Sequence, residues 1–218
     1  MCRCARMVLG NIMSDDSKNY TNPGLLISVA ELSDQLSADG ELPLVIDLRP
    51  AEQFVAGHIP GAVHLDLFGV SLVDTDPAPL SAFLWVIWHL LSSRGTDHAR
   101  RVVVYDEQSG IRAARAFWAL EYFGHLDVRL LDGGFGVWER EGALVTQDAE
   151  SPSAVSGVAK PVDDRLATWN DVRDCLERTD VAVVDTRSDA EYYGTKVRAK
   201  RGGAIPGAVH IEWVKNLD

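Results

Sequence analysis

An internal duplication constrains this chain more than any other feature of its sequence. The hexapeptide Ile-Pro-Gly-Ala-Val-His occupies residues 59–64 and occurs again at residues 205–210. An Asp-x-Arg triplet precedes each copy, at residues 47–49 and 185–187, and an apolar run precedes each triplet. Self-similarity of this kind indicates that one structural unit is present twice, so both regions should build the same strand, turn and strand.

Residues 24–146 are predicted to form one complete α/β unit. Apolar, β-branched runs predict strands at residues 44–46, 102–105 and 128–131, with another strand after the turn at residues 58–65. Helical spacing predicts helices at residues 26–36, 80–91 and 113–123, and a last helix that ends at residue 142. This alternation is typical of an α/β fold with a parallel sheet flanked by helices.

The rest of the chain is predicted to be a linker and an incomplete second unit. Residues 147–161 are rich in Ala, Ser, Gly and Pro without periodicity, which is typical of a linker. From residue 162 the pattern of the first unit begins again, with a strand expected at residues 181–184, so residues 162–218 should form the first half of a second unit. Residues 1–23 are expected to be a disordered tail, with translation starting at Met1 or Met13.

The charge and the cysteine content exclude several classes of protein. The chain has 32 Asp and Glu residues against 21 Lys and Arg, and its formal net charge of −11 repels nucleic acid and anionic membranes. Cys2, Cys4 and Cys175 are too scattered for a disulfide framework or a tetrahedral metal site. We therefore expect a cytoplasmic protein that needs no metal and no other cofactor.

The loop after the strand at residues 102–105 has the features of an anion-binding site. It consists of Glu107, Gln108, Ser109, Gly110, Ile111 and Arg112. The loop ends at a helix N-terminus, where unpaired N–H groups and the helix dipole favour negative charge, and Arg112 adds a positive charge. Such a loop can hold a thiolate if it opens with a cysteine, but this one opens with Glu107. We expect the Glu107 carboxylate to fill the loop and to pair with Arg112, which would close it to substrate.

Taken together, these motifs resemble the rhodanese family. The resemblance is carried by Asp47-x-Arg49 with Glu52, Gly57-His-Ile-Pro-Gly-Ala-Val, the loop at residues 107–112, Leu131-Asp-Gly-Gly-x-x-x-Trp138, Asp185-Thr-Arg187 and Ile205-Pro-Gly-Ala. The whole chain resembles a two-domain thiosulfate or 3-mercaptopyruvate sulfurtransferase that stops inside its second domain. This resemblance implies a catalytically silent first domain and an active second one.

The resemblance also implies the roles of particular residues. Aligning residues 108–112 with the family's Cys-Gln-Ser-Gly-Val-Arg type of loop puts Glu107 at the position of the nucleophilic cysteine, so the loop should be vestigial. The equivalent loop of the second copy would open roughly 35 residues beyond Asp218, so this chain should be inactive. Arg187 is the candidate for steering an anionic sulfur donor, and Asp185 for orienting the loop. A purely structural Asp–Arg pair is the alternative.

Two hypotheses for the function follow from the resemblance. A complete enzyme of this kind would take sulfane sulfur from a small anionic donor onto a cysteine, as a persulfide, and pass it to cyanide or to a thiol. The alternative is a non-catalytic rhodanese-like module that binds a protein or a small anion. A phosphatase with the same fold is disfavoured, because its loop is one residue longer than residues 107–112. Cys175 is expected to be a packing residue, since it lies in a helix and not after a strand.

Overall fold

The computed structural model describes residues 20–108, 110–156 and 159–216. They form two compact units, one ending at Leu166 and the other beginning at Ala167. The first 19 residues of the predicted tail, which include Cys2 and Cys4, lie outside the described residues, and so does Ser109 of the predicted loop.

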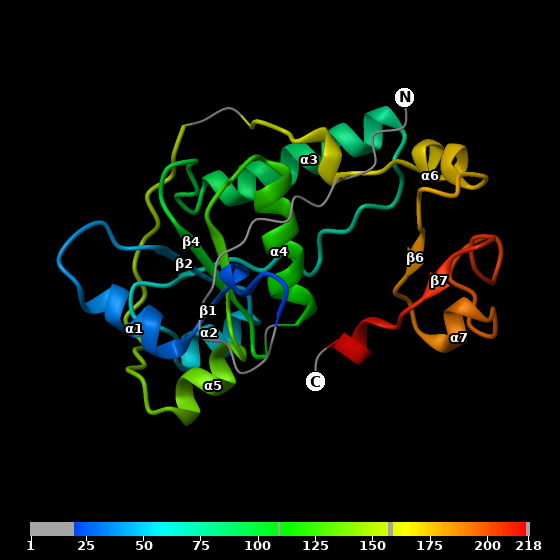
Figure 1. The fold of residues 1–218 in the computed structure, drawn as a ribbon. Helices are drawn as coiled ribbons and strands as arrows, with labels where there is room; N and C mark the ends of the chain where they lie inside the picture. Colours follow the sequence, from blue (N-terminus) through cyan, green and yellow to red (C-terminus); the bar gives the residue numbers. More distant parts are fainter. Residues whose placement is uncertain (1–19, 109, 157–158, 217–218) are drawn as a thin grey trace. The chain divides into compact units, whose positions relative to one another are not determined.

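The first unit is built around a parallel sheet of five strands in the order β1-β5-β4-β2-β3 (Figure 1). The strands are β1 (Leu26–Ile27), β2 (Leu44–Asp47), β3 (Val63–His64), β4 (Val102–Tyr105) and β5 (Val128–Leu131). Every pairing between neighbouring strands of this sheet is parallel. The predicted α/β fold with a parallel sheet flanked by helices is therefore confirmed.

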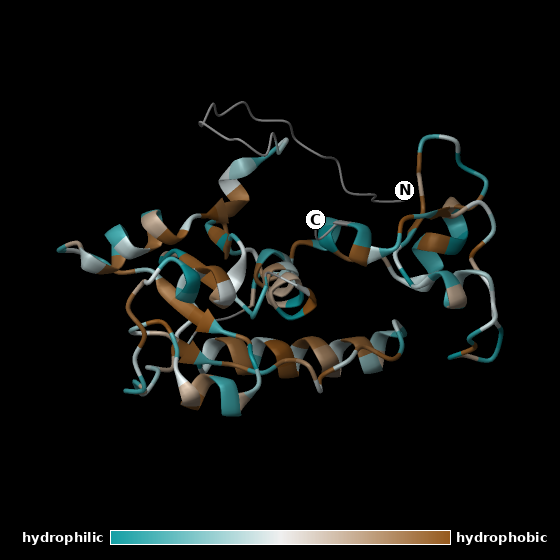
Figure 2. Ribbon diagram, turned by 90° about the horizontal axis from the view of Figure 1, so that it is seen from below, coloured by the Kyte–Doolittle hydropathy of each residue, from teal (hydrophilic) through white to brown (hydrophobic). Residues whose placement is uncertain are grey.

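Helices cover both faces of this sheet and create two hydrophobic cores. The helices are α1 (Val29–Ser37), α2 (Ala51–Ala56), α3 (Pro77–Ser92), α4 (Ile111–Tyr122) and α5 (Gly134–Arg140), with short 3₁₀ helices η1 (Pro23–Leu25) and η2 (Asp163–Arg165). One core packs α3 and α4 against Val102 and Val104 of β4. The other packs α1, α2 and α5 against Val103 and Tyr105. Successive β4 side chains alternate between the faces, as a strand buried on both sides requires. The apolar strands and helix α3 are visible in Figure 2.

The predicted first helix begins three residues later than expected. Leu26 and Ile27 form β1, which pairs with Leu130 and Leu131 of β5. The helix starts at Val29, and the Ser28 hydroxyl caps it by accepting the N–H of Glu31 at 3.2 Å. The start was misplaced because β1 exists only through a pairing distant in the sequence.

The second unit repeats the opening elements of the first. It contains α6 (Trp169–Cys175), β6 (Val184–Asp185), α7 (Asp189–Tyr192), β7 (Val209–His210) and η3 (Trp213–Asn216). β6 pairs with β7 in parallel, with Val184 opposite Val209 and Asp185 opposite His210. The strand predicted at residues 181–184 is thus displaced and shorter.

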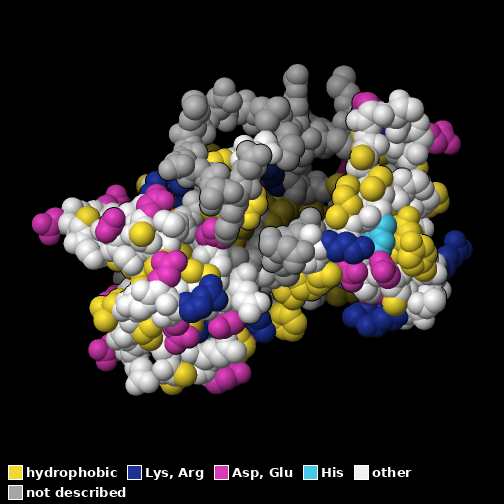
Figure 3. Space-filling view, turned by 60° about the horizontal axis from the view of Figure 1, so that its bottom comes forward, with side chains coloured by type: hydrophobic (Ala, Val, Ile, Leu, Met, Phe, Trp, Pro, Cys, Tyr) yellow, Lys and Arg dark blue, Asp and Glu magenta, His cyan; other side chains and the backbone are white. Residues whose placement is uncertain are grey.

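Burial in the second unit is sparse. Among the described residues from Ala167 onward, the buried side chains are Cys175 and Ala208. Val184 and Val209 are each about half exposed, and Figure 3 shows apolar side chains at the surface of this unit among charged ones. Trp213 is 38% exposed, because the described part of the unit has no second layer to cover it. Among the described residues, no helix has the length and apolar character that crossing a membrane requires.

Candidate functional site

The loop after β4 is organised by a carboxylate that sequence reasoning overlooked. Asp106 follows the strand directly and is 5% exposed. Its two carboxylate oxygens accept the backbone N–H groups of Gln108 at 3.1 Å, Gly110 at 2.8 Å, Arg112 at 3.2 Å and Ala113 at 3.1 Å. These N–H groups line the loop and the first turn of α4, so the loop does hold an anion, and the anion belongs to the protein.

The predicted pairing of Glu107 with Arg112 is wrong. Arg112 donates to the Asp66 carboxylate at 2.7 Å, and its guanidinium lies 4.3 Å from the centre of the Phe68 ring. The Glu107 carboxylate is 3.7 Å from Nη1 of Arg49 and 51% exposed. Glu107 therefore faces a different part of the molecule from the α4 N-terminus.

Strand alternation explains which carboxylate turns inward. Val102 and Val104 face the core that contains α4, and Asp106 continues that side of the strand. Val103 and Tyr105 face the core that contains α5, and Glu107 lies on their side. The alternation of side chains along residues 102–107 can be predicted from the sequence, and it would have identified Asp106 as the residue directed at the α4 N-terminus.

The loop is also fastened to α5. The N–H of Phe135 donates to the Asp106 carbonyl at 2.9 Å, and the N–H of Gly136 donates to the Glu107 carbonyl at 3.0 Å. Gly134 has φ +62°, and a β-carbon there would lie 2.5 Å from the Asp106 carbonyl oxygen. The glycines of Leu131-Asp-Gly-Gly thus permit the close approach that positions the loop.

Asp47 and Arg49 form a buried ion pair at the end of β2. Nε of Arg49 donates to Oδ1 of Asp47 at 3.1 Å and Nη2 donates to Oδ2 at 2.7 Å. Nη2 also donates to the Gly57 carbonyl at 2.6 Å, and the guanidinium lies 3.6 Å from the centre of the Phe135 ring. The hydroxyl of Tyr105 donates to Oδ2 of Asp47 at 2.6 Å. This pair ties β2 to the turn after α2 and to β4.

The electrostatics of this pair follow from burial and from its partners. Burial alone lowers the pKa of Arg49, but the hydrogen bond and the charge of Asp47 outweigh it and raise the pKa above its usual value. Burial, followed by the charge and the hydrogen bond of Asp47, raises the pKa of Tyr105 far above its usual range. Arg49 therefore stays charged and Tyr105 stays neutral around neutral pH, which suits a structural role.

Asp185 and Arg187 reproduce the same geometry in the second unit. Nε of Arg187 donates to Oδ1 of Asp185 at 2.9 Å, Nη2 donates to Oδ2 at 2.6 Å, and Nη2 donates to the Gly203 carbonyl at 3.0 Å. Nε2 of His210 donates to the Arg187 carbonyl at 2.8 Å, as Nε2 of His64 does to Arg49 at 2.9 Å. The Arg187 side chain is 45% exposed, so this guanidinium is accessible to an anion.

Mutual hydrogen bonding shifts both pKa values of the second pair. The hydrogen bond from Arg187 lowers the pKa of Asp185, and the hydrogen bond from Asp185 raises the pKa of Arg187. Both groups are therefore charged across the physiological range. Among the described residues, no cluster of three or more His, Cys, Asp or Glu side chains could hold a metal ion.

Comparison with known proteins identifies the family. A model of the rhodanese-like domain matches residues 28–141, about half of the chain. The thiosulfate sulfurtransferases of Azotobacter vinelandii and Pseudomonas aeruginosa are each 34% identical to it, over 92% and 91% of this chain and 73% of each relative. The chain belongs to the rhodanese family, as its motifs predicted.

Solved structures support the same assignment. SseA from Escherichia coli, described among 3-mercaptopyruvate sulfotransferases, matches with a TM-score of 0.70 at 26% identity, over 87% of this chain and 75% of SseA. A probable thiosulfate sulfurtransferase matches with a TM-score of 0.63 at 29% identity, over 80% of this chain and 71% of its own. Both solved structures thus share the fold of this chain and carry names from the same group as the curated relatives.

Proposed function

We propose that this chain is a two-domain member of the sulfurtransferase group, with a silent first domain and the first half of a second one. The silent domain is residues 24–146, the linker 147–161 and the half domain 162–218, of which residues 162–166 pack with the first compact unit. The repeated register supports this division, since Asp185 opposes His210 across β6 and β7 as Asp47 opposes His64 across β2 and β3.

The main support for a catalytically inactive first domain is that a side chain of the protein already binds the N–H groups of the β4 loop. The Asp106 carboxylate takes the four N–H groups that could otherwise stabilise a thiolate. A carboxylate cannot form a persulfide. Cys175, the cysteine among the described residues, lies in α6 and is 4% exposed, so it is not placed at an equivalent loop.

The reaction of a complete enzyme of this group would proceed in two displacements. A cysteine thiolate attacks the outer sulfur of thiosulfate, the S–S bond breaks with its electron pair leaving on sulfite, and the cysteine holds a persulfide. Cyanide or a thiolate then attacks the outer persulfide sulfur, and the cysteine leaves as a thiolate. 3-Mercaptopyruvate is the other candidate donor. In a complete enzyme of this group, the nucleophile would follow a strand equivalent to β4, which pairs with β2 in the first unit.

Asp185 and Arg187 are the substrate-binding residues of this proposal. The exposed guanidinium of Arg187 can attract and orient an anionic donor near the carboxyl end of β6. Asp185 fixes the direction of that guanidinium through two hydrogen bonds. Asp47 and Arg49 form a buried pair in the unit proposed to be silent, so we do not assign them to the sulfur donor.

The test is sulfur transfer to cyanide by the purified 218-residue chain. Thiosulfate and 3-mercaptopyruvate serve as alternative donors, with Cys175→Ser as the control variant. We expect no thiocyanate above the uncatalysed rate with either donor. Turnover that disappears in Cys175→Ser would show that Cys175 is the nucleophile and would overturn our assignment. Turnover that persists in this variant would overturn the prediction that the chain is inactive.

A non-catalytic rhodanese-like binding module is the second candidate. The β4 loop, whose N–H groups are already bound by Asp106, favours this candidate. A domain that folds without a nucleophile still has surfaces and cavities that can bind a ligand. A cytoplasmic location, predicted from the cysteine content, belongs to both candidates, and neither candidate requires nucleic acid or a membrane. Retention of a small ligand by a chain that transfers no sulfur would support this candidate.

A further inference from the structure

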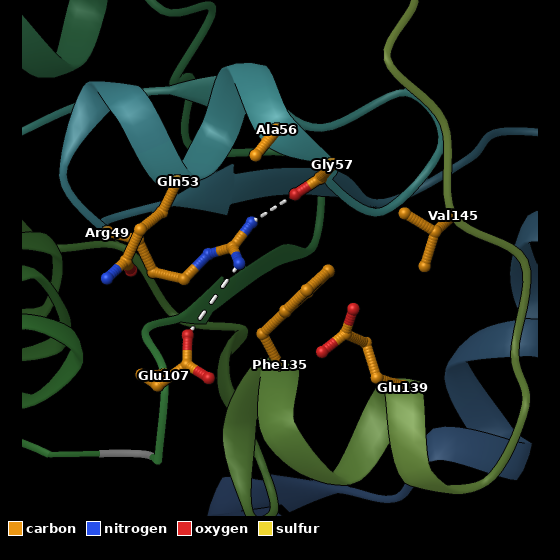
Figure 4. Close-up of a pocket in the computed structure, with 8 residues that line it drawn as sticks. All are labelled: Arg49, Gln53, Ala56, Gly57, Glu107, Phe135, Glu139 and Val145. Atoms are coloured by element: carbon orange, nitrogen blue, oxygen red, sulfur yellow. Dashed lines mark hydrogen bonds and ion pairs between the residues drawn. The ribbon is translucent and has the colours of Figure 1, made fainter.

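A cavity of about 300 Å³ lies in the first unit beside the buried Arg49. Its lining includes Gln53 of α2, Glu107 of the β4 loop, Phe135 and Glu139 of α5, and Val145 (Figure 4). Small-ligand sites typically combine an apolar wall with a few polar groups, and this volume is at the lower end of their range. The cavity belongs wholly to the first unit and is separate from the donor-binding pair proposed in the second.

One nitrogen of the buried guanidinium lacks a hydrogen-bond acceptor. Nε and Nη2 of Arg49 are satisfied by Asp47 and by the Gly57 carbonyl. Nη1 has the Glu107 carboxylate at 3.7 Å, which is longer than a hydrogen bond. Arg49 is 3% exposed, so water reaches this nitrogen chiefly through the cavity. The floor of the cavity thus presents a donor that an acceptor group of a ligand can satisfy.

The other polar side chains of the cavity carry negative charge. Figure 4 shows the Arg49 guanidinium and the Glu139 carboxylate on either side of the Phe135 ring. Glu139 is exposed and, among the described residues, makes no ion pair or side-chain hydrogen bond, so it is available to a cationic group. A simple anion would meet Glu107 and Glu139, and a simple cation would meet Arg49 and leave Nη1 without an acceptor.

We propose that this cavity binds a small zwitterion of the ω-amino acid type. Its carboxylate accepts from Nη1 of Arg49, its ammonium group pairs with Glu139, and its apolar chain lies along the edge of Phe135. Glu107 competes with the ligand carboxylate for Arg49. Because Glu107 is half exposed and held only by a long contact, it can turn into solvent when the ligand enters. This binding site is independent of the sulfur chemistry.

The test is an NMR titration of the ¹⁵N-labelled chain with glycine, β-alanine, 4-aminobutyrate and 5-aminopentanoate. Butyrate and butylamine are the anionic and cationic comparison ligands. We expect saturable shifts of the Gly57, Phe135 and Gly136 amides with an amino acid long enough to pass the ring, and weaker binding of both comparison ligands. Absence of saturable shifts near Phe135 with every zwitterion would overturn the proposal.

Two charge variants give effects of opposite sign. Glu139→Gln removes the partner of the ammonium group and should weaken binding about two- to fivefold, the size of an exposed ion pair. Glu107→Gln removes the competing carboxylate and should strengthen binding by about the same factor. Both side chains are exposed, so both variants should fold.

Glu141→Gln is the matched control, since it removes the same charge from an exposed position outside the cavity lining. It should leave binding unchanged. Tighter binding in both cavity variants would show that the cavity takes an anion, and weaker binding in both that it takes a cation. Either result, or an equal effect of Glu141→Gln and Glu139→Gln, would refute the zwitterion.

Discussion

The two Asp-x-Arg pairs show one motif in two environments. The Nε to Oδ1 distance is 3.1 Å in the Asp47–Arg49 pair and 2.9 Å in the Asp185–Arg187 pair. In each pair Nη2 also donates to the carbonyl of a glycine. Arg49 is 3% exposed and Arg187 is 45% exposed. The local sequence therefore builds the ion pair, and more distant elements decide whether it is buried.

The covering elements of the first pair are β4 and α5. Tyr105 donates its hydroxyl to Asp47, and Phe135 stacks on the guanidinium of Arg49. Among the described residues, no hydroxyl group and no aromatic ring performs these tasks at Asp185 and Arg187. The same motif is thus covered in the first unit and exposed to solvent in the second.

Removing the arginine of each pair should give the largest difference between the two units. Arg49→Ala leaves the Asp47 carboxylate fully buried without its partner, so we expect a loss of about 3–5 kcal/mol in the free energy of unfolding. Arg187→Ala removes an exposed partner from an Asp185 side chain that is itself 8% exposed, so the loss should be smaller, about 1–2 kcal/mol. Urea unfolding followed by tryptophan fluorescence measures both. Similar losses in the two variants would show that burial does not separate the pairs.

Removing one tyrosine hydroxyl from each unit tests the covering elements directly. The Tyr105 hydroxyl donates to Asp47 at 2.6 Å and accepts the N–H of Ile59 at 3.3 Å, so Tyr105→Phe should cost on the order of 2 kcal/mol. The Tyr192 hydroxyl donates to the Ala208 carbonyl at 3.0 Å, so Tyr192→Phe should cost on the order of 0.5–1 kcal/mol. The same urea titrations compare them, and a larger loss for Tyr192→Phe would contradict the ranking.

The sequence predicts the fold well where strong local patterns coincide with burial. The strand at residues 102–105 was found at its predicted bounds, because an unbroken β-branched run is stable only inside a sheet covered on both faces. The start of the first helix was misplaced because Leu26 and Ile27 pair with a strand about a hundred residues away. Local propensity carries no information about such a pairing.

The site was predicted less well, because either of two neighbouring carboxylates, Asp106 or Glu107, could bind the N–H groups of the loop. Family alignment put Glu107 at the position of the nucleophile, whereas Asp106 holds the loop N–H groups. The alternation of side chains along β4 determines which of the two carboxylates faces the α4 N-terminus. An alignment of loop motifs without gaps carries no information about this alternation. The exposure of Arg187 could not be predicted from the sequence either, because Arg187 lies in the same Asp-x-Arg motif as the buried Arg49.

Cysteine substitution in the β4 loop separates the roles of the two carboxylates. In a background with Cys2, Cys4 and Cys175 changed to serine, Asp106→Cys places a thiol where four N–H groups converge, and Glu107→Cys places one at a half-exposed position. The loop N–H groups and the α4 dipole should lower the thiol pKa of Asp106→Cys by about one unit or more below 8.5, and that of Glu107→Cys much less. The pH dependence of iodoacetamide alkylation measures both values. The reverse order would restore Glu107 as the residue that fills the loop.

The smallest expected effect is an acid sensitivity of the first unit. His125 is 5% exposed, and burial lowers its pKa below the usual 6.5, with only partial compensation from the Arg100 carbonyl and from nearby carboxylates. Below about pH 6.5 the unfolded chain therefore takes up this proton before the folded chain does, and the free energy of unfolding falls as the pH is lowered.

A phenylalanine at position 125 removes the titrating group but keeps an aromatic ring in the buried site. Between about pH 7.5 and about pH 5.5, the melting temperature of the unmodified chain should drop by a few degrees more than that of His125→Phe. Differential scanning fluorimetry at the two pH values measures this difference. Equal drops in the two chains would mean that folding does not lower the pKa of His125.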